Sequence, residues 1–220
     1  MKLDYIFKDQ ALLKTALTHP SLSKDKQIVS YEKLEFLGDN VLNLVIAEVL
    51  YSTFDKLDEG KLSQIHSNLV CTRTLSSIAQ TLELGEYMLL DKGEETNGGR
   101  TNDKNLENCL EALIAAVFLD SDFTTTKNLF LPYWQAFIDN KEYAFKRDAK
   151  SLLQEWSQKN KFGLPQYQVI SEDGLAHNKI FTISVNIEGY TQATASSSSI
   201  KKAEALTAEE FIKINGINCE

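Results

Sequence analysis

One amphipathic segment, residues 31–54, constrains this chain more than any other stretch. It begins YEKLEFLGDNVL, over residues 31–42. At about 100° per residue, a helix here gathers apolar side chains on one side. Those side chains are Leu34, Leu37, Val41, Leu44, Val45 and Val49. The segment therefore predicts a helix whose apolar side packs into a helical domain.

Three acids, Glu32, Glu35 and Asp39, fall on roughly the opposite side of this helix, at i, i+3 and i+7. They lack basic partners at i+4, and like charges at such spacings each cost a helix roughly 0.2–0.5 kcal/mol. A solvated surface is the ordinary explanation of such a row. A second acid-bearing helix later in the chain favours a divalent cation between carboxylates instead.

Two other residues of the segment have special positions. Gly38 falls near the apolar side, where a missing Cβ allows close packing, although glycine costs a helix roughly 1 kcal/mol relative to alanine. Phe36 points away from the apolar side and lies close to the acids. An aromatic ring left at a surface needs a partner, and a second subunit is one candidate.

The second acid-bearing helix is predicted over about residues 104–119. Its predicted buried side consists of Leu106, Leu110, Leu113 and Val117. Glu107, Asn108 and Glu111 are expected on the other side, within one turn of each other. Two helices that bring oxygen ligands to one point would form a hard-cation site suited to Mg²⁺.

Helices are also predicted over residues 4–18, 59–70 and 72–83. His19 follows the first of these, and a structural hydrogen-bonding role explains it better than catalysis does. Glu59 begins the next helix, where it either complements the helix dipole or belongs to an active site. A polar loop at 91–105 contains two glycines followed by Arg100, which suits a turn with a phosphate contact.

The charge of the chain is unevenly distributed. The net charge is −8, yet residues 150–214 carry seven basic and seven acidic side chains, and the remainder carries 16 basic and 24 acidic ones. The acidity therefore belongs to the first two-thirds, where a metal site would concentrate it, and total charge is a weak guide to nucleic-acid binding. No apolar run approaches a membrane span, the N-terminus has no signal-peptide pattern, and the three cysteines lack metal spacing. We expect a cytoplasmic protein with no membrane partner.

Residues 32–39, EKLEFLGD, closely resemble the signature helix of bacterial ribonuclease III. Three more motifs match that family in the expected order: DEG at 58–60, GGR at 98–100 and EALI at 111–114. The resemblance implies an all-α N-terminal nuclease domain, over residues 1–143. It also implies roles by position: Asp39 and Glu111 as catalytic carboxylates; Glu35, Asp39, Asn108 and Glu111 as metal ligands; Glu32 and Glu59 as accessory acids; Phe36 as a dimer contact; and Arg100 as an RNA contact.

One position departs from the family pattern. The family usually has aspartate where this chain has Asn108, which keeps a carbonyl oxygen but loses one negative charge. We expect lower affinity for Mg²⁺ as a result. Glu107 is close enough in sequence to compensate.

Residues 144–149 are predicted as a linker, and residues 150–217 as a second domain. A helix is expected at 151–161, strands at 166–171, 179–187 and 192–195, turns at 172–174 and 188–189, and a last helix at 200–214. This α-β-β-β-α order, an α+β fold, resembles the double-stranded RNA-binding domain. The resemblance assigns RNA contacts to Gln154, His177, Lys201 and Lys202, although Ile200 stands where the family often has a basic residue.

The function implied is Mg²⁺-dependent hydrolysis of double-stranded RNA by a homodimer, with Mn²⁺ as an alternative ion. Products would carry 5′-phosphates and 3′-hydroxyls, and precursors of ribosomal and messenger RNA are the expected substrates. The alternative is a double-stranded RNA-binding protein that does not cleave. Asn108 and Ile200 motivate that alternative, whereas Glu32, Glu35, Asp39, Glu59 and Glu111 argue against it.

Overall fold

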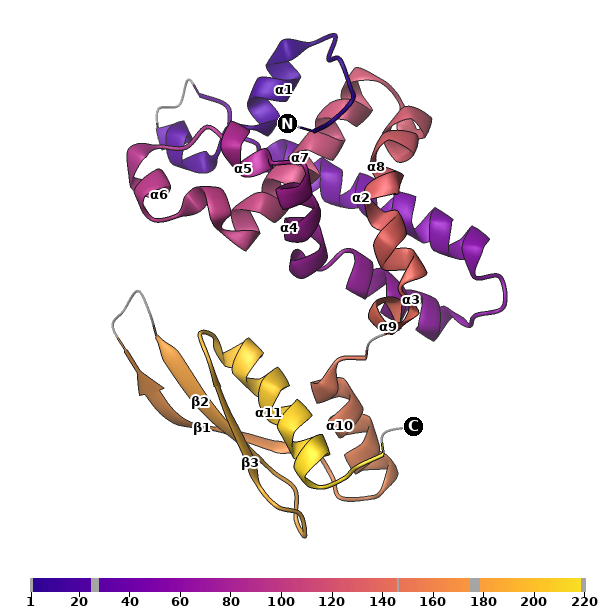
Figure 1. The fold of residues 1–220 in the computed structure, drawn as a ribbon, viewed down its shortest axis with the longest axis vertical. Coiled ribbons are helices and arrows are strands. Elements are labelled where there is room, and N and C mark those ends of the chain that lie inside the picture. The colour runs from indigo at the N-terminus through magenta and orange to yellow at the C-terminus, as the bar shows by residue number, and fades with distance from the viewer. Residues whose placement is uncertain (1, 25–27, 146, 175–178, 219–220) are drawn as a thin grey trace. The chain divides into compact units, whose positions relative to one another are not determined.

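The computed structural model describes residues 2–24, 28–145, 147–174 and 179–218. The chain divides into two compact units, Met1–Lys146 and Arg147–Glu220. Figure 1 shows that the first unit is helical and that the second contains a three-stranded sheet with two helices. The predicted fold class, an all-α unit followed by an α+β unit, is confirmed. Nowhere in the described parts of the chain does a helix have the length and apolar character needed to cross a membrane.

In the first unit, helix α7 (Asp103–Asp120) lies in the middle of the other helices (Figure 1). The remaining helices are α1 (Gln10–Ala16), α2 (Glu32–Thr53), α3 (Glu59–Leu69), α4 (Thr72–Thr81), α5 (Leu84–Tyr87), α6 (Lys92–Thr96), α8 (Phe123–Asp139) and α9 (Lys141–Ala144), with 3-10 turns at Pro20–Lys24 and Gly99–Thr101. Contacts with α1, α2, α4, α5 and α8 reach α7 from several directions. The core of this unit is therefore built around one helix.

The predicted orientation of α7 is wrong in one respect. The apolar period indicated a single buried side, but residues 106, 107 and 109–117 are all buried. A helix surrounded by neighbours has no solvent side, so its polar residues are buried with the rest. Glu107 and Glu111 retain only 7% and 6% of their surface exposed.

Helix α2 also departs from prediction at one position. Leu44, assigned to the apolar side, is 58% exposed. Phe36 is 75% exposed, in the outward direction expected for it, and Tyr51 is exposed as well. Three large apolar side chains of α2 are thus left at the surface of the single chain.

The N-terminal helix is shorter than predicted, because residues before Asp9 are held by another helix. Asp120, at the end of α7, accepts hydrogen bonds from the backbone N–H groups of Lys8 and Asp9 and from the Tyr5 hydroxyl, at 2.8–2.9 Å. Asp9 then caps α1 by accepting from the Ala11 N–H. Helix α8, which contains Pro132 and is capped by Asp122, is not predicted from the sequence.

The second unit follows the predicted α-β-β-β-α order, with α10 (Ala149–Lys159), β1 (Gln166–Asp173), β2 (Ile180–Asn186), β3 (Ala193–Ser197) and α11 (Ile200–Ile214). The strands pair antiparallel in the order β1-β2-β3. Both helices lie on one side of the sheet (Figure 1). Between them and the sheet lies a small core that includes Leu153, Val185 and Phe211.

Two predictions for the second unit, the turn at 172–174 and the RNA contact at His177, are not confirmed by the structure. Residues 172 and 173, predicted as a turn, belong to β1 and pair with Phe181 and Ile180 of β2. The register shifts between Val169 and Ser171, and pairing then continues to Asp173. His177 lies outside the described residues.

Candidate metal centre

The site is built where α2 crosses α7 in backbone contact. A Cβ added at Gly38 would lie 1.7 Å from the carbonyl oxygen of Glu111 and 2.4 Å from its carbonyl carbon. Only a residue without a side chain fits at this crossing. Glu35 and Asp39 precede and follow Gly38 by less than one turn, so the crossing brings both acids near Glu111.

The carboxylates of this cluster raise one another's pKa through electrostatic repulsion. Burial raises the pKa of Glu111 to about 8, with further increases from the charges of Glu107 and Asp39. Burial also raises the pKa of Glu35, and Glu32, Glu107 and Asp39 add to that shift. Lys104 acts in the opposite direction on both groups. The described cluster therefore brings together more carboxylates than Lys104 can balance.

Two oxygen atoms of the cluster have no hydrogen-bond partner among the described residues. They are Oδ1 of Asn108 and Oε2 of Glu107, and both atoms are buried. Lys104 Nζ forms an ion pair with the Glu107 Oε2 at 3.1 Å, so the Asn108 Oδ1 is the one of the two oxygens that no described donor or cation satisfies. Buried oxygens without a donor are costly unless another group, such as a cation, satisfies them.

Asp39 is positioned by Asn43 and His66, which no sequence motif identifies. Asn43, one turn later on α2, donates its side-chain N–H to Asp39 Oδ1 at 2.8 Å. His66 of α3 donates from Nε2 to the Asn43 carbonyl at 3.1 Å, because a carbonyl can only accept. The i+4 spacing of Asn43 from Asp39 was visible in the sequence, whereas its link to His66 was not.

The two predicted accessory acids lie at the starts of helices. Glu32 is exposed in the first turn of α2, and its Oε2 accepts from the Ser30 hydroxyl at 2.7 Å. Glu59 is exposed in the first turn of α3, and its Oε1 accepts from the Ser63 hydroxyl at 2.9 Å. Helix starts favour acids in any case, so the geometry leaves both explanations of Glu59 open.

The donor set fits a hard divalent cation in chemistry, although the side chains are not closed around one. In the described parts of the chain, no group of three or more histidine, cysteine, aspartate or glutamate side chains is near enough to hold an ion. Oxygen donors from Glu35, Asp39, Asn108 and Glu111, with an unsatisfied buried oxygen among them, are what Mg²⁺ prefers.

His19 has a structural role in this unit. Its Nδ1 accepts from the Ser21 backbone N–H at 3.0 Å, which leaves the proton on Nε2. Nε2 is then placed to donate to Asn105 Oδ1 at 3.2 Å, and Asn105 donates to Glu94 Oε1 at 2.7 Å. This chain of bonds joins the segment before α2 to the start of α7, consistent with the structural explanation given above.

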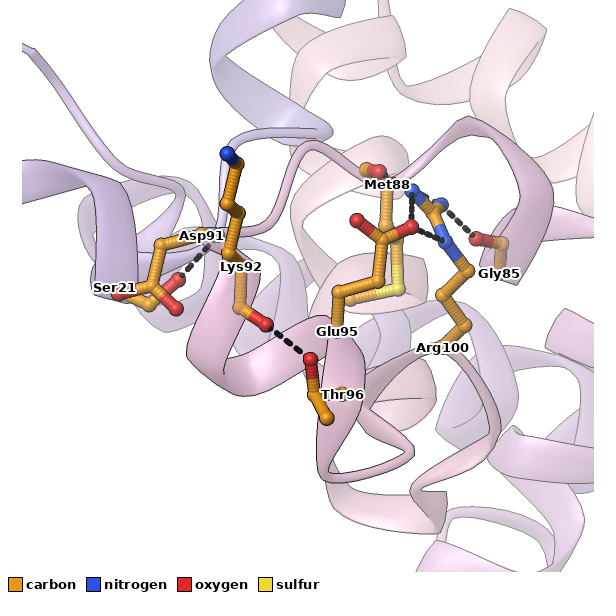
Figure 2. A network of polar contacts seen from close by, with 8 residues as sticks. All are labelled: Ser21, Gly85, Met88, Asp91, Lys92, Glu95, Thr96 and Arg100. Atoms are coloured by element: carbon orange, nitrogen blue, oxygen red, sulfur yellow. Dashed lines mark hydrogen bonds and ion pairs between the residues drawn. The ribbon is translucent and has the colours of Figure 1, made fainter.

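Arg100 is engaged inside the unit (Figure 2). Its Nη1 donates to the carbonyl oxygens of Gly85 and Met88, at 2.8 and 2.9 Å. Its Nε and Nη2 contact Glu95 Oε1, each at 2.8 Å. A guanidinium that holds α5 to the loop before α7 must exchange these partners before it can contact a phosphate.

The predicted RNA contacts of the second unit lie at its surface. Gln154 is exposed on α10, and Lys201 and Lys202 are exposed in the first turn of α11. The Ser199 hydroxyl caps α11 by accepting from the Lys202 backbone N–H at 3.3 Å. Lysines beside the first N–H groups of a helix suit an anionic ligand.

Comparisons with known proteins agree with both halves of this description. Residues 9–135 match a family model described as ribonuclease-III-like, and residues 149–214 match the double-stranded RNA binding motif. The chain is 46% identical over 213 residues to ribonuclease 3 of Rickettsia bellii, covering 96% of this chain and 93% of that protein. It is 44% identical over 218 residues to ribonuclease 3 of Wolbachia pipientis wMel, with 96% and 92% covered. The solved nuclease domain of ribonuclease III from Campylobacter jejuni is 41% identical, with a TM-score of 0.57, covering 60% of this chain and 90% of that domain.

Proposed function

The chain belongs to the ribonuclease III family, and from that premise we propose that it is an endonuclease that hydrolyses phosphodiester bonds of double-stranded RNA. The observation that supports this most directly is the α2–α7 crossing at Gly38, which brings Glu35 and Asp39 to the buried Glu111. The RNA-binding motif in the second unit supports a duplex substrate. We retain residues 1–143 as the nuclease domain and 150–217 as the RNA-binding domain.

We propose that Glu35, Asp39, Asn108 and Glu111 hold Mg²⁺, for which Mn²⁺ can substitute. A bound ion of this kind lowers the pKa of its water and stabilises the oxygen that leaves phosphorus. Asp39 is oriented for this role by Asn43. Glu111, whose pKa is about 8 because of burial, must lose its proton to serve as a ligand, so cation binding and proton release are coupled.

Glu32 and Glu59 are proposed as accessory acids beside the cleavage site. Each is exposed and held by a hydroxyl of its own segment, so neither is used in packing. Products are expected to carry 5′-phosphates and 3′-hydroxyls, as hydroxide attack on phosphorus with departure of the 3′ oxygen requires.

A homodimer is proposed through the exposed apolar side of α2. Phe36, Leu44 and Tyr51 lie on this helix at 75%, 58% and 79% exposure. Apolar groups left at a surface favour association. The nuclease domain from Campylobacter jejuni is described as having a region involved in dimer formation. Two copies would bring two metal centres to one duplex.

The second unit is proposed to hold the duplex through Gln154, His177, Lys201 and Lys202. Such domains span roughly 16 base pairs and read shape across minor grooves rather than sequence. Arg100 is proposed chiefly to stabilise the first unit, and it would contact RNA only if it exchanged Gly85, Met88 and Glu95 for a phosphate. From family membership we also expect a cytoplasmic enzyme that acts on precursors of ribosomal and messenger RNA.

The test is cleavage of a long RNA duplex by the purified full chain. With Mg²⁺ we expect shorter duplexes with 5′-phosphate ends, and with a chelator no cleavage. Single-stranded RNA and a DNA duplex of the same sequence are the matched substrates that should stay intact. Binding of duplex RNA without cleavage at any Mg²⁺ or Mn²⁺ concentration would establish the non-cleaving alternative.

A further inference from the structure

Glu107 is a buried acid to which the mechanism above gives no role. It is 7% exposed, and its Oε2 has no hydrogen-bond partner among the described residues. Removing a carboxylate from water without donors costs several kcal/mol. Glu107 lies in the second turn of α7, where the ion pair with Lys104 compensates its burial.

The position of Glu107 on α7 is as close to Glu111 as that of Asn108. At about 100° per residue, Glu107 lies about 40° from Glu111 around the helix axis, and Asn108 lies about 60° from it on the other side. Glu107 is also the first of the charged neighbours that affect Glu111, and it affects Glu35 across the helix crossing. Its carboxylate therefore belongs to the same cluster as the proposed ligands.

Lys104 is the cation that accompanies Glu107. Its Nζ lies 3.1 Å from Glu107 Oε2, one turn earlier on α7. The ammonium group of Lys104 is therefore the cation that the structure places beside the Glu107 carboxylate.

We propose that Glu107 supplies the metal-ligating carboxylate that Asn108 lacks, and that Lys104 is its counter-ion when no metal is bound. The inference rests on the proposed function in taking this cluster as the metal centre. The negative charge that an aspartate at position 108 would supply then comes from position 107. Cation binding then displaces Lys104 from Glu107.

The experiment measures Mn²⁺ binding to the full chain without RNA, by the electron paramagnetic resonance signal of free Mn²⁺. In Glu107→Gln we expect affinity to fall by about 10-fold or more, because the charge of ligands sets cation affinity. In the double variant Glu107→Gln with Asn108→Asp, affinity should return to within about 3-fold of the wild type. Lys104→Met should bind Mn²⁺ more tightly than the wild type.

Asp103→Asn is the matched control. Asp103 is exposed, lies on the same helix and carries the same charge, so its loss should change Mn²⁺ affinity by less than about 2-fold. Circular dichroism checks that each variant is folded. The double variant has the same formal charge as the wild type, so it remains informative if Glu107→Gln alone unfolds.

Three outcomes overturn the inference: wild-type Mn²⁺ affinity in folded Glu107→Gln, a double variant that folds but does not recover affinity, or unchanged affinity in Lys104→Met. Cleavage of duplex RNA by the wild-type chain is measured in parallel. If cleavage is normal and Mn²⁺ affinity does not depend on Glu107, the inference is wrong and the proposed function stands. If Mn²⁺ affinity depends on Glu107 but the chain does not cleave duplex RNA, the proposed function is wrong and the inference stands.

Discussion

The first unit keeps two glutamates inside its helical core, whereas the second unit keeps its described charged side chains at or near the surface. Glu107 and Glu111 are buried beside α2. In the described part of the second unit the buried polar residues are Ser157, Ser184 and Thr207, which carry no charge. Its acids instead form ion pairs with basic neighbours: Arg147 with Glu155, Lys150 with Glu204, and Lys179 with Glu172.

This difference separates a unit built for chemistry from a unit built for contact. Buried, poorly compensated carboxylates destabilise a fold by several kcal/mol, and surface ion pairs contribute about 0–1 kcal/mol. Buried carboxylates are retained despite this destabilisation where they have a function, such as binding a cation. The second unit needs only a stable frame for exposed side chains, so its core is small and apolar.

The largest effect expected is on cleavage, from Glu111→Ala. Removing this carboxylate from the crossing should lower the cleavage rate by more than about 100-fold, because loss of even an outer partner of a metal ligand costs 10- to 100-fold. Duplex RNA binding, measured by mobility shift in Ca²⁺, should stay within about 2-fold, since the second unit is unchanged. Cleavage at the wild-type rate would remove Glu111 from the mechanism.

Next in size is the effect of Gly38→Ala on the stability of the first unit. The new Cβ would meet the Glu111 backbone carbonyl at 1.7 Å, so α2 and α7 must separate, at a cost of about 3 kcal/mol. Urea unfolding followed by Trp134 fluorescence measures this in a Trp156→Phe background, since the chain has two tryptophans, one in each unit. At Gly60 a Cβ would have its nearest contact at 3.6 Å, so Gly60→Ala should leave stability unchanged or raise it slightly.

The third prediction concerns pH and the metal-free protein. Because burial raises the pKa of Glu111 to about 8 from an ordinary 4.5, the folded state keeps a proton that the unfolded state releases between these values. The free energy of unfolding of the first unit should therefore fall as pH rises from about 4.5 to about 8. The change is measured as the midpoint of urea unfolding, followed by Trp134 fluorescence at each pH in the presence of a chelator. Glu111→Gln should flatten the profile, and an unchanged slope in that variant would assign the effect to other groups.

The smallest effect expected is on RNA binding by the second unit. Lys201→Ala and Lys202→Ala should each weaken duplex binding and reduce the salt dependence of log K by about 1, through loss of one phosphate contact. Lys213→Ala, in the last turn of the same helix, is the matched control.

Arg100→Ala tests the contrast between the units: it should leave the salt dependence unchanged and destabilise the first unit by about 2 kcal/mol through lost hydrogen bonds. A reduced salt slope in Arg100→Ala would instead support the RNA contact predicted from the sequence.

Sequence reasoning succeeded where one local pattern decides the outcome. The last helix was predicted at 200–214 and is observed over Ile200–Ile214, because Ser199 is a good cap and the apolar period is clear. The strands were predicted within a few residues, since alternation and turns are local signals. It failed for α7, because periodicity reports one apolar side and cannot show that neighbours surround a helix.

The sequence by itself determined which residue types are available: two helices with oxygen donors, a glycine between the acids of the first, and a basic turn at the start of α11. Only the tertiary structure decided that Gly38 meets the backbone of Glu111, that Glu107 is buried beside Lys104, and that Arg100 is held by Gly85 and Met88. Those contacts join residues far apart in the chain or set their burial. Local propensity carries no information about either, because both depend on how whole helices pack.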